Sequence, residues 1–76
     1  MGSATVIIKI NGVEVMCGDW NIEDIVEYDE AKTIYNDTGD ELFIPAKAIE
    51  EKIPGDESEY CTKYTFDNVE VYVEFI

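Results

Sequence analysis

An α+β fold, mainly antiparallel β, is the class that this sequence predicts, in a single compact domain. Two observations predict it: a self-consistent hairpin pattern at each end of the chain, and a proline-led apolar segment between them that suits one short helix. We expect an N-terminal hairpin over 5–17, middle strands over about 22–28, 33–36 and 41–44, a helix over about 45–53, and a C-terminal hairpin over 60–75. The domain is placed at 4–76, and residues 1–3 are interpreted as a tag remnant or a disordered segment.

The N-terminal hairpin is predicted by Asn11 and Gly12, which lie between two alternating apolar runs. Both residues accept the positive φ of a type I′ turn, so a two-residue loop fixes the register. Lys9 then opposes Glu14 on one face. The other face is apolar and consists of three cross-strand pairs: Ile10 with Val13, Ile8 with Val15, and Val6 with Cys17.

The C-terminal hairpin repeats this device around Asp67 and Asn68. Its apolar face consists of four pairs: Phe66 with Val69, Tyr64 with Val71, Thr62 with Val73, and Tyr60 with Phe75. Its reverse face is predicted to be a solvent or interaction surface, and it carries Cys61, Lys63, Thr65, Glu70, Tyr72 and Glu74.

Residues 22–36 fit two templates. As a helix, Ile22, Ile25 and Val26 share an apolar face. As strands, 22–28 and 33–36 flank a four-residue turn over 29–32, with Tyr28 opposite Thr33 and Val26 opposite Tyr35. We favour the strands, because Thr-Ile-Tyr has high β propensity.

The helix over 45–53 is predicted from its ends and its spacing. Pro45 occupies a first helical position, Ile49 and Ile53 lie one turn apart, and Pro54 with Gly55 ends the segment.

Charge dominates the composition: 18 Asp and Glu face five Lys, with no Arg or His, for a net charge of −13 over 76 residues. Histidine is the usual general base at neutral pH, and arginine is the usual residue that binds anions. Because the chain has neither, we expect that it is not an enzyme and that it has no catalytic residue and no cofactor. Residues 19–30 resemble a calcium loop in their oxygen ligands, but Asp24 stands where that loop needs glycine, so no metal site is expected. Cys17 and Cys61 are expected to be free thiols, with Cys17 a small core residue.

The location predicted from the sequence is cytoplasmic, in the host cell if the protein is phage-encoded. No apolar run approaches the roughly 20 residues of a membrane span, so no membrane partner is expected. Self-association is an expected further source of stability, because a chain this short has only a small hydrophobic core.

Direct nucleic-acid binding is opposed by the charge, because it depends on Lys and Arg. Conversely, rows of carboxylates can occupy the basic groove with which another protein binds DNA or RNA. The expected partner is therefore a basic nucleic-acid-binding protein or complex; the alternative is a small acidic regulatory or interaction domain without mimicry. The candidate partner-binding residues are Asp19, Trp20, Glu23, Asp24, Glu27, Asp29, Glu30, Asp37, Glu70, Tyr72 and Glu74.

The segment TKYTFD, residues 62–67, is similar to a run in small acidic anti-CRISPR proteins of type I-F systems. In size, acidity and mixed structure the chain also resembles the wider group of phage-encoded nucleic-acid mimics, which includes the uracil-DNA glycosylase inhibitor. The resemblance implies stoichiometric inhibition of a CRISPR surveillance complex through its crRNA or DNA channel. It implies no catalytic or binding position in this sequence.

Overall fold

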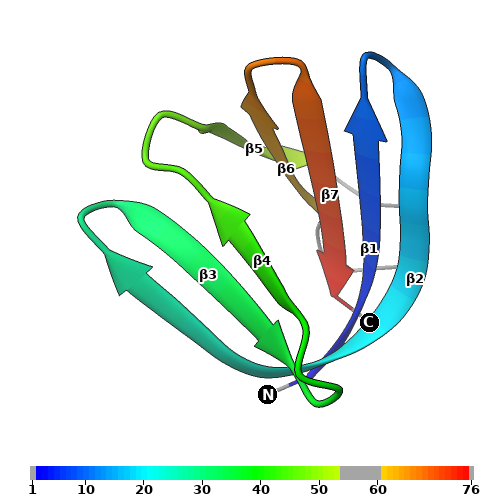
Figure 1. Cartoon of the computed structure of the whole chain (residues 1–76), viewed down its shortest axis with the longest axis vertical. Helices are drawn as coiled ribbons and strands as arrows, with labels where there is room; N and C mark the ends of the chain where they lie inside the picture. The colour runs from blue at the N-terminus through cyan, green and yellow to red at the C-terminus, as the bar shows by residue number, and fades with distance from the viewer. Residues whose placement is uncertain (1, 54–60, 76) are drawn as a thin grey trace.

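Seven antiparallel strands form one sheet in the computed structural model, which describes residues 2–53 and 61–75. The strands are β1 (Ser3–Ile10), β2 (Val13–Tyr28), β3 (Ala31–Asn36), β4 (Glu41–Ile44), β5 (Ile49–Ile53), β6 (Cys61–Phe66) and β7 (Val69–Phe75). Their order across the sheet is β4-β3-β2-β1-β7-β6-β5 (Figure 1). The described residues contain no helix, so the α+β prediction is wrong and the class is all-β.

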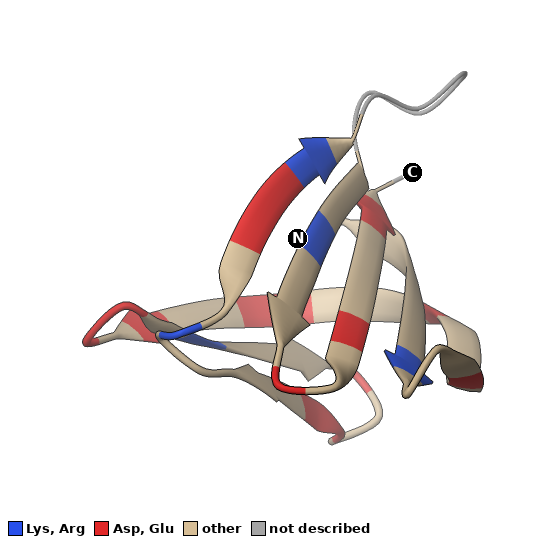
Figure 2. Cartoon of the chain, turned by 90° about the horizontal axis from the view of Figure 1, so that it is seen from above, with Lys and Arg blue, Asp and Glu red and all other residues tan. Residues whose placement is uncertain are grey.

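The long strand β2 divides the sheet into two halves. Its first part, 13–21, pairs with β1, and its last part, 22–28, pairs with β3. We call residues 22–44 the β3 half, and residues 2–21, 45–53 and 61–75 the β1 half. The two halves lie at a steep angle to each other (Figure 2). Their inner faces share one core of eight buried residues: Ala4, Val6, Ile22, Ile34, Ile44, Tyr64, Val71 and Val73.

The register predicted for the C-terminal hairpin is confirmed for Phe66 with Val69, Tyr64 with Val71, and Thr62 with Val73. Tyr60, in the fourth predicted pair, lies outside the described residues. One placement on the reverse face is wrong, because Cys61 is only 9% exposed. Its neighbours in the ladder are Glu74 of β7 and Ile53 of β5, a strand that the prediction lacked.

The N-terminal hairpin follows the prediction only near its turn, where Ile10 pairs with Val13 and Lys9 with Glu14. A register shift between Ile8 and Lys9 then adds one residue to β2. A bulge of this kind reverses which side chains face the core.

Two predicted pairs of that hairpin are therefore wrong, since Ile8 pairs with Met16 and Val6 with Gly18. Met16 packs against the core, whereas Val15 and Cys17 are exposed. Both cysteines are free thiols, and the prediction that Cys17 is a core residue is wrong. Ile10 and Val13, which the prediction placed on the apolar face, are also exposed.

The predicted helix over 45–53 is the main error. A turn closed by the Ala48 N–H, which donates to the Pro45 carbonyl over 3.0 Å, leads directly into strand β5. Ile49 is 63% exposed, so the spacing of Ile49 and Ile53 did not mark a buried helical face. Pairing with β6 satisfies the backbone of this segment instead.

The middle strands are confirmed, and the helical alternative for 22–36 is not observed. Their turn is shorter than predicted, with Asp29 and Glu30 both at positive φ, 51° and 68°. Tyr28 therefore pairs with Ala31 and Val26 with Thr33, two residues away from the predicted register. The shorter turn lengthens β3 to Ala31–Asn36.

The chain start also takes part in the sheet. Ser3 is the first residue of β1, and the Ile22 N–H donates to the Gly2 carbonyl over 2.9 Å. Among the described residues, no helix is long and apolar enough to span a membrane.

Candidate functional site

Negative charge is distributed unequally between the two halves. The β3 half contains eight carboxylates and one lysine, whereas the β1 half contains seven carboxylates and four lysines. In Figure 2 the β1 half shows red and blue segments together on β5, and its β7, which carries red segments, lies between β1 and β6, which carry blue ones. The β3 half is therefore the part of the described chain where negative charge is least compensated.

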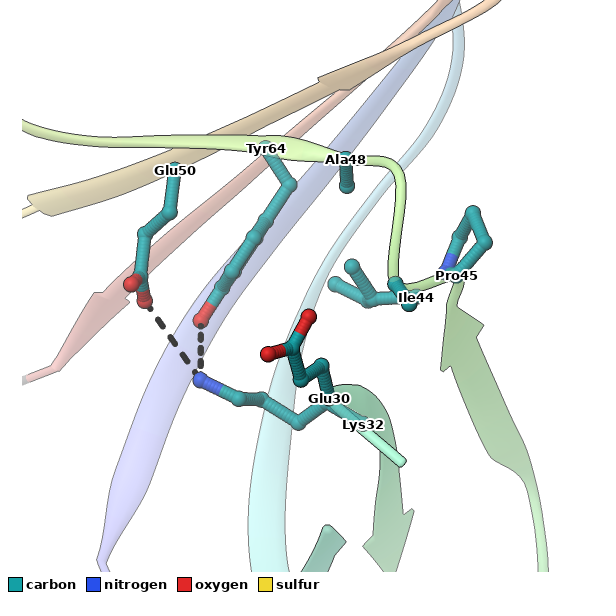
Figure 3. Close-up of a pocket in the computed structure, with 8 residues that line it drawn as sticks. Glu30, Lys32, Ile44, Pro45, Ala48, Glu50 and Tyr64 are labelled. Carbon is teal, nitrogen blue, oxygen red and sulfur yellow. Dashed lines mark hydrogen bonds and ion pairs between the residues drawn. The ribbon is translucent and has the colours of Figure 1, made fainter. Parts of the chain in front are cut away.

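Lys32, the single lysine of the β3 half, points towards the β1 half. Its Nζ lies 3.4 Å from Glu50 Oε1 and 3.3 Å from the Tyr64 hydroxyl (Figure 3). It also lies 3.5 Å from Glu27 Oε1. Partial burial opposes the ammonium charge, but the contacts with Tyr64 and Glu50 outweigh it and raise the pKa of Lys32. Lys32 thus stays charged and is used internally, so it does not neutralise the outer surface.

A small open cavity lies beside this contact, between the two halves. It has a volume of about 200 Å³, and its polar lining includes Glu27, Lys32, Glu50, Lys52 and Thr62. Two glutamates thus face two lysines, so the lining has no net charge that would select an anion or a cation. Among the described residues, no group of three carboxylate or thiol side chains is arranged to hold a metal ion.

Four of the predicted partner-binding carboxylates outside β7 have internal contacts. Asp19 accepts a hydrogen bond from the Thr5 hydroxyl over 3.0 Å, and Asp37 accepts one from Asn21 Nδ2 over 3.1 Å. Asp24 accepts from the Ile25 N–H over 2.8 Å at a register shift of β2. The fourth is Glu27, already described beside Lys32. All four remain exposed to solvent.

Glu70, Tyr72 and Glu74 lie on β7, in the β1 half, apart from the acidic run of β2. The Tyr72 hydroxyl donates to Glu70 over 2.9 Å, and Lys63 pairs with Glu70 over 3.2 Å. Lys9 and Lys63 also lie over the Tyr72 ring, 5.4 and 5.7 Å from its centre. The hydrogen bond from Tyr72 and the contact with Lys63 lower the pKa of Glu70. The charge of Glu70 is therefore compensated within the molecule.

The remaining predicted residues differ in their surroundings. Trp20 is partly buried and packs against the core, where it pairs in register with Ala4. Glu23, Asp29 and Glu30 are exposed. Glu30 also lines a pocket with Ile44, Pro45 and Ala48, and its carboxylate points towards that pocket (Figure 3).

Five functional candidates were missed by sequence reasoning: Val26, Tyr28, Tyr35, Glu41 and Phe43. They lie on the outer face of β2, β3 and β4, where Tyr35 pairs with both Asp24 and Glu41. The alternation of β4 contained a signal, because Phe43 stands out of phase with the apolar pair Leu42 and Ile44. The cross-strand partners of these residues were not predicted, because the turn predicted over 29–32 is two residues longer than the observed turn at Asp29 and Glu30.

Comparison with known proteins adds no relative: the chain matches no family model, no curated protein and no solved structure. The candidate site therefore rests on its own geometry and charge.

Proposed function

We propose that this chain is a non-enzymatic binding protein or inhibitor that uses the β3 half in place of nucleic-acid phosphates, occupying the basic DNA- or RNA-binding channel of another protein. The observation that carries the proposal is the charge of this half, eight carboxylates against a single lysine that points inward. A CRISPR surveillance complex in the cytoplasm of a host cell, which the TKYTFD resemblance implies, is one target of this kind.

Two physical properties support this use. A surface rich in one sign of charge attracts an oppositely charged partner over long range and accelerates the encounter. Four of the carboxylates stand on paired strands, and the other four lie in the short turns that join these strands: Glu23, Asp24, Glu27 and Glu41 on the strands, and Asp29, Glu30, Asp37 and Asp40 in the turns. A sheet therefore presents them at fixed positions without the ordering cost of a disordered acidic tail.

Two triple variants test the proposal. Glu23→Gln, Asp29→Asn and Glu41→Gln together remove three exposed charges from the β3 half. Glu14→Gln, Glu51→Gln and Glu74→Gln remove three exposed charges from the β1 half and serve as the matched control. Both variants have the same net charge, so a difference between them reports position.

The assay is capture of proteins from a bacterial lysate on the immobilised chain, followed by elution with double-stranded DNA or with salt. We expect the wild type and the control triple to retain a nucleic-acid-binding protein that DNA releases, and the β3-half triple to lose it. Equal loss from both triples would show that only total charge matters. Capture that DNA does not compete would favour an acidic interaction domain without mimicry.

A further inference from the structure

The outer face of β2, β3 and β4, which points away from the core, carries large apolar side chains in register. Val26 pairs with Thr33, and Thr33 pairs with Phe43 on its other side. Val26 is 45% exposed, Phe43 59% and Tyr28, two positions along β2, 78%. The residues of the neighbouring row, Ile25, Ile34 and Leu42, pair with one another and face the core instead. Apolar contact area on this face is therefore exposed in the chain alone.

The adjacent row on this face combines an aromatic ring with two carboxylates. Tyr35 pairs with Asp24 on one side and with Glu41 on the other. Since neighbouring strands are about 4.8 Å apart, the two acidic residues stand about 10 Å apart with the Tyr35 ring between them. A Lys or Arg side chain placed there can contact a carboxylate and the ring together. The cation-binding row and the apolar row are separated by about 7 Å.

We propose that Asp24, Val26, Tyr28, Tyr35, Glu41 and Phe43, the outer patch, bind a protein segment in which a cationic side chain stands about 7 Å from an apolar one. This inference rests on the proposed function, to which it adds the chemistry of the partner surface. The apolar row makes the contact more than a substitute for phosphates, because phosphates offer no hydrophobic contact.

Charge selects this occupant over the others that an apolar face could bind. A second copy would bring a chain of net charge −13 against an equally acidic face, and like charges at an interface oppose binding. Nucleic acids and anionic membrane surfaces are repelled for the same reason. A basic protein segment satisfies both rows, since its cations pair with Asp24 and Glu41 while its apolar side chains cover Val26 and Phe43.

Two synthetic peptides of equal length and charge test the inference. The probe is Arg-Ser-Leu-Ser-Phe-Ser-Arg, which in an extended form places Arg, Leu and Phe on one side, and the control is Arg-Ser-Gly-Ser-Gly-Ser-Arg. We expect the probe to bind about tenfold more tightly by fluorescence anisotropy, because it buries apolar side chains on the patch. Amide shifts of Val26, Thr33 and Phe43 should report the contact.

Matched variants locate the binding. Phe43→Ser should reduce probe binding to the level of the control peptide, whereas Ile49→Ser, at a similarly exposed position outside the patch, should leave it unchanged. Glu41→Gln should weaken both peptides, and Glu14→Gln neither. Equal binding of the two peptides, or equal binding by wild type and Phe43→Ser, would overturn the inference.

The outcome separates this inference from the proposed function. If Phe43→Ser has no effect while lysate capture is still released by DNA, the outer patch is not a docking site and mimicry stands. If Phe43→Ser abolishes probe binding while DNA releases nothing, the patch stands and mimicry falls. Sedimentation experiments test whether the chain self-associates. Self-association that is abolished by Phe43→Ser would mean that the patch binds a second copy, and this result would overturn the inference.

Discussion

Val71 and Val15 show how identical side chains in two hairpins acquire different energetic roles. Val71 of β7 is completely buried, whereas Val15 of β2 is 57% exposed beside the register shift. Removing two methyl groups from a packed site loses their transfer free energy and leaves a cavity. The same removal from an exposed site loses little.

Val71→Ala is expected to lower the free energy of unfolding by about 1 to 3 kcal/mol, measured by urea denaturation. Val15→Ala is the control and should change it by less than about 0.5 kcal/mol. Similar losses in the two variants would contradict the observed register of β2.

Glu50 gives a prediction for pH at the same scale. Partial burial alone would raise the pKa of Glu50, but the charge and hydrogen bonds of Lys32 and Tyr64 outweigh it and lower that pKa. The folded state then binds the proton more weakly than the unfolded chain, so the stabilisation is present above the ordinary glutamate pKa. It is lost as the pH falls through the lowered value.

The stability difference between wild type and Glu50→Gln should therefore be constant near neutral pH and shrink below about pH 4.5. It should stay under about 1 kcal/mol, because the Glu50 side chain is 44% exposed and solvent screens the pair. Urea midpoints from pH 3 to 7 measure it. In a Lys32→Met background the pH dependence of this difference should shrink, because the largest contribution that lowers the pKa of Glu50 is removed. An unchanged pH dependence there would assign the effect to another partner.

At the scale of elements, the turn between β2 and β3 is the hairpin turn whose residues least suit its backbone conformation. Asp29 and Glu30 both adopt positive φ, a conformation that costs a residue other than glycine about 1 to 2 kcal/mol. The N-terminal hairpin uses Asn11 and Gly12 for a turn of the same length. The exposed turn at Glu30 is thus a place where the sequence is not optimised for its backbone.

Glu30→Gly is expected to raise the free energy of unfolding by about 1 kcal/mol, since part of the relieved strain is offset by the greater freedom of glycine in the unfolded chain. Glu30→Gln, which removes the same charge but keeps the side chain, is the control. Equal gains in the two variants would mean that charge rather than φ limits the stability of this hairpin.

For the whole molecule, the excess of carboxylates makes folding depend on ionic strength. Compaction brings like charges together, and dissolved salt screens them, since the Debye length falls from about 30 Å at 0.01 M to about 8 Å at 0.15 M. The excess in the β3 half makes this half the main source of repulsion.

The melting temperature should rise by several degrees between 0.01 and 0.15 M NaCl, because a gain of 1 kcal/mol shifts a domain of this size by roughly 4 to 8 °C. The triple Glu23→Gln, Asp29→Asn and Glu41→Gln should reduce this rise more than the triple Glu14→Gln, Glu51→Gln and Glu74→Gln. Thermal scans by circular dichroism measure it. A melting temperature independent of salt would show that repulsion is not a major term in folding.

The sequence by itself determined the features that depend on neighbouring residues. Asn11 and Gly12 specify a tight turn through their tolerance of positive φ, and Asp67 adopts positive φ in the C-terminal turn, so both hairpins and the register of the C-terminal one were predictable. The charge excess is likewise a property of composition, as is the acidic run on β2.

Tertiary structure decided what depends on distant partners. The bulge near Val15 follows from placing Met16 rather than Val15 against the core, and β5 exists because β6 offers its segment a partner. The inward direction of Lys32 follows from Glu50 and Tyr64 on the facing half. In each case the local sequence did not specify the outcome, and contacts between residues far apart in the chain decided it. The outer patch arises in the same way, because three strands must pair before Asp24, Tyr35 and Glu41 form one row.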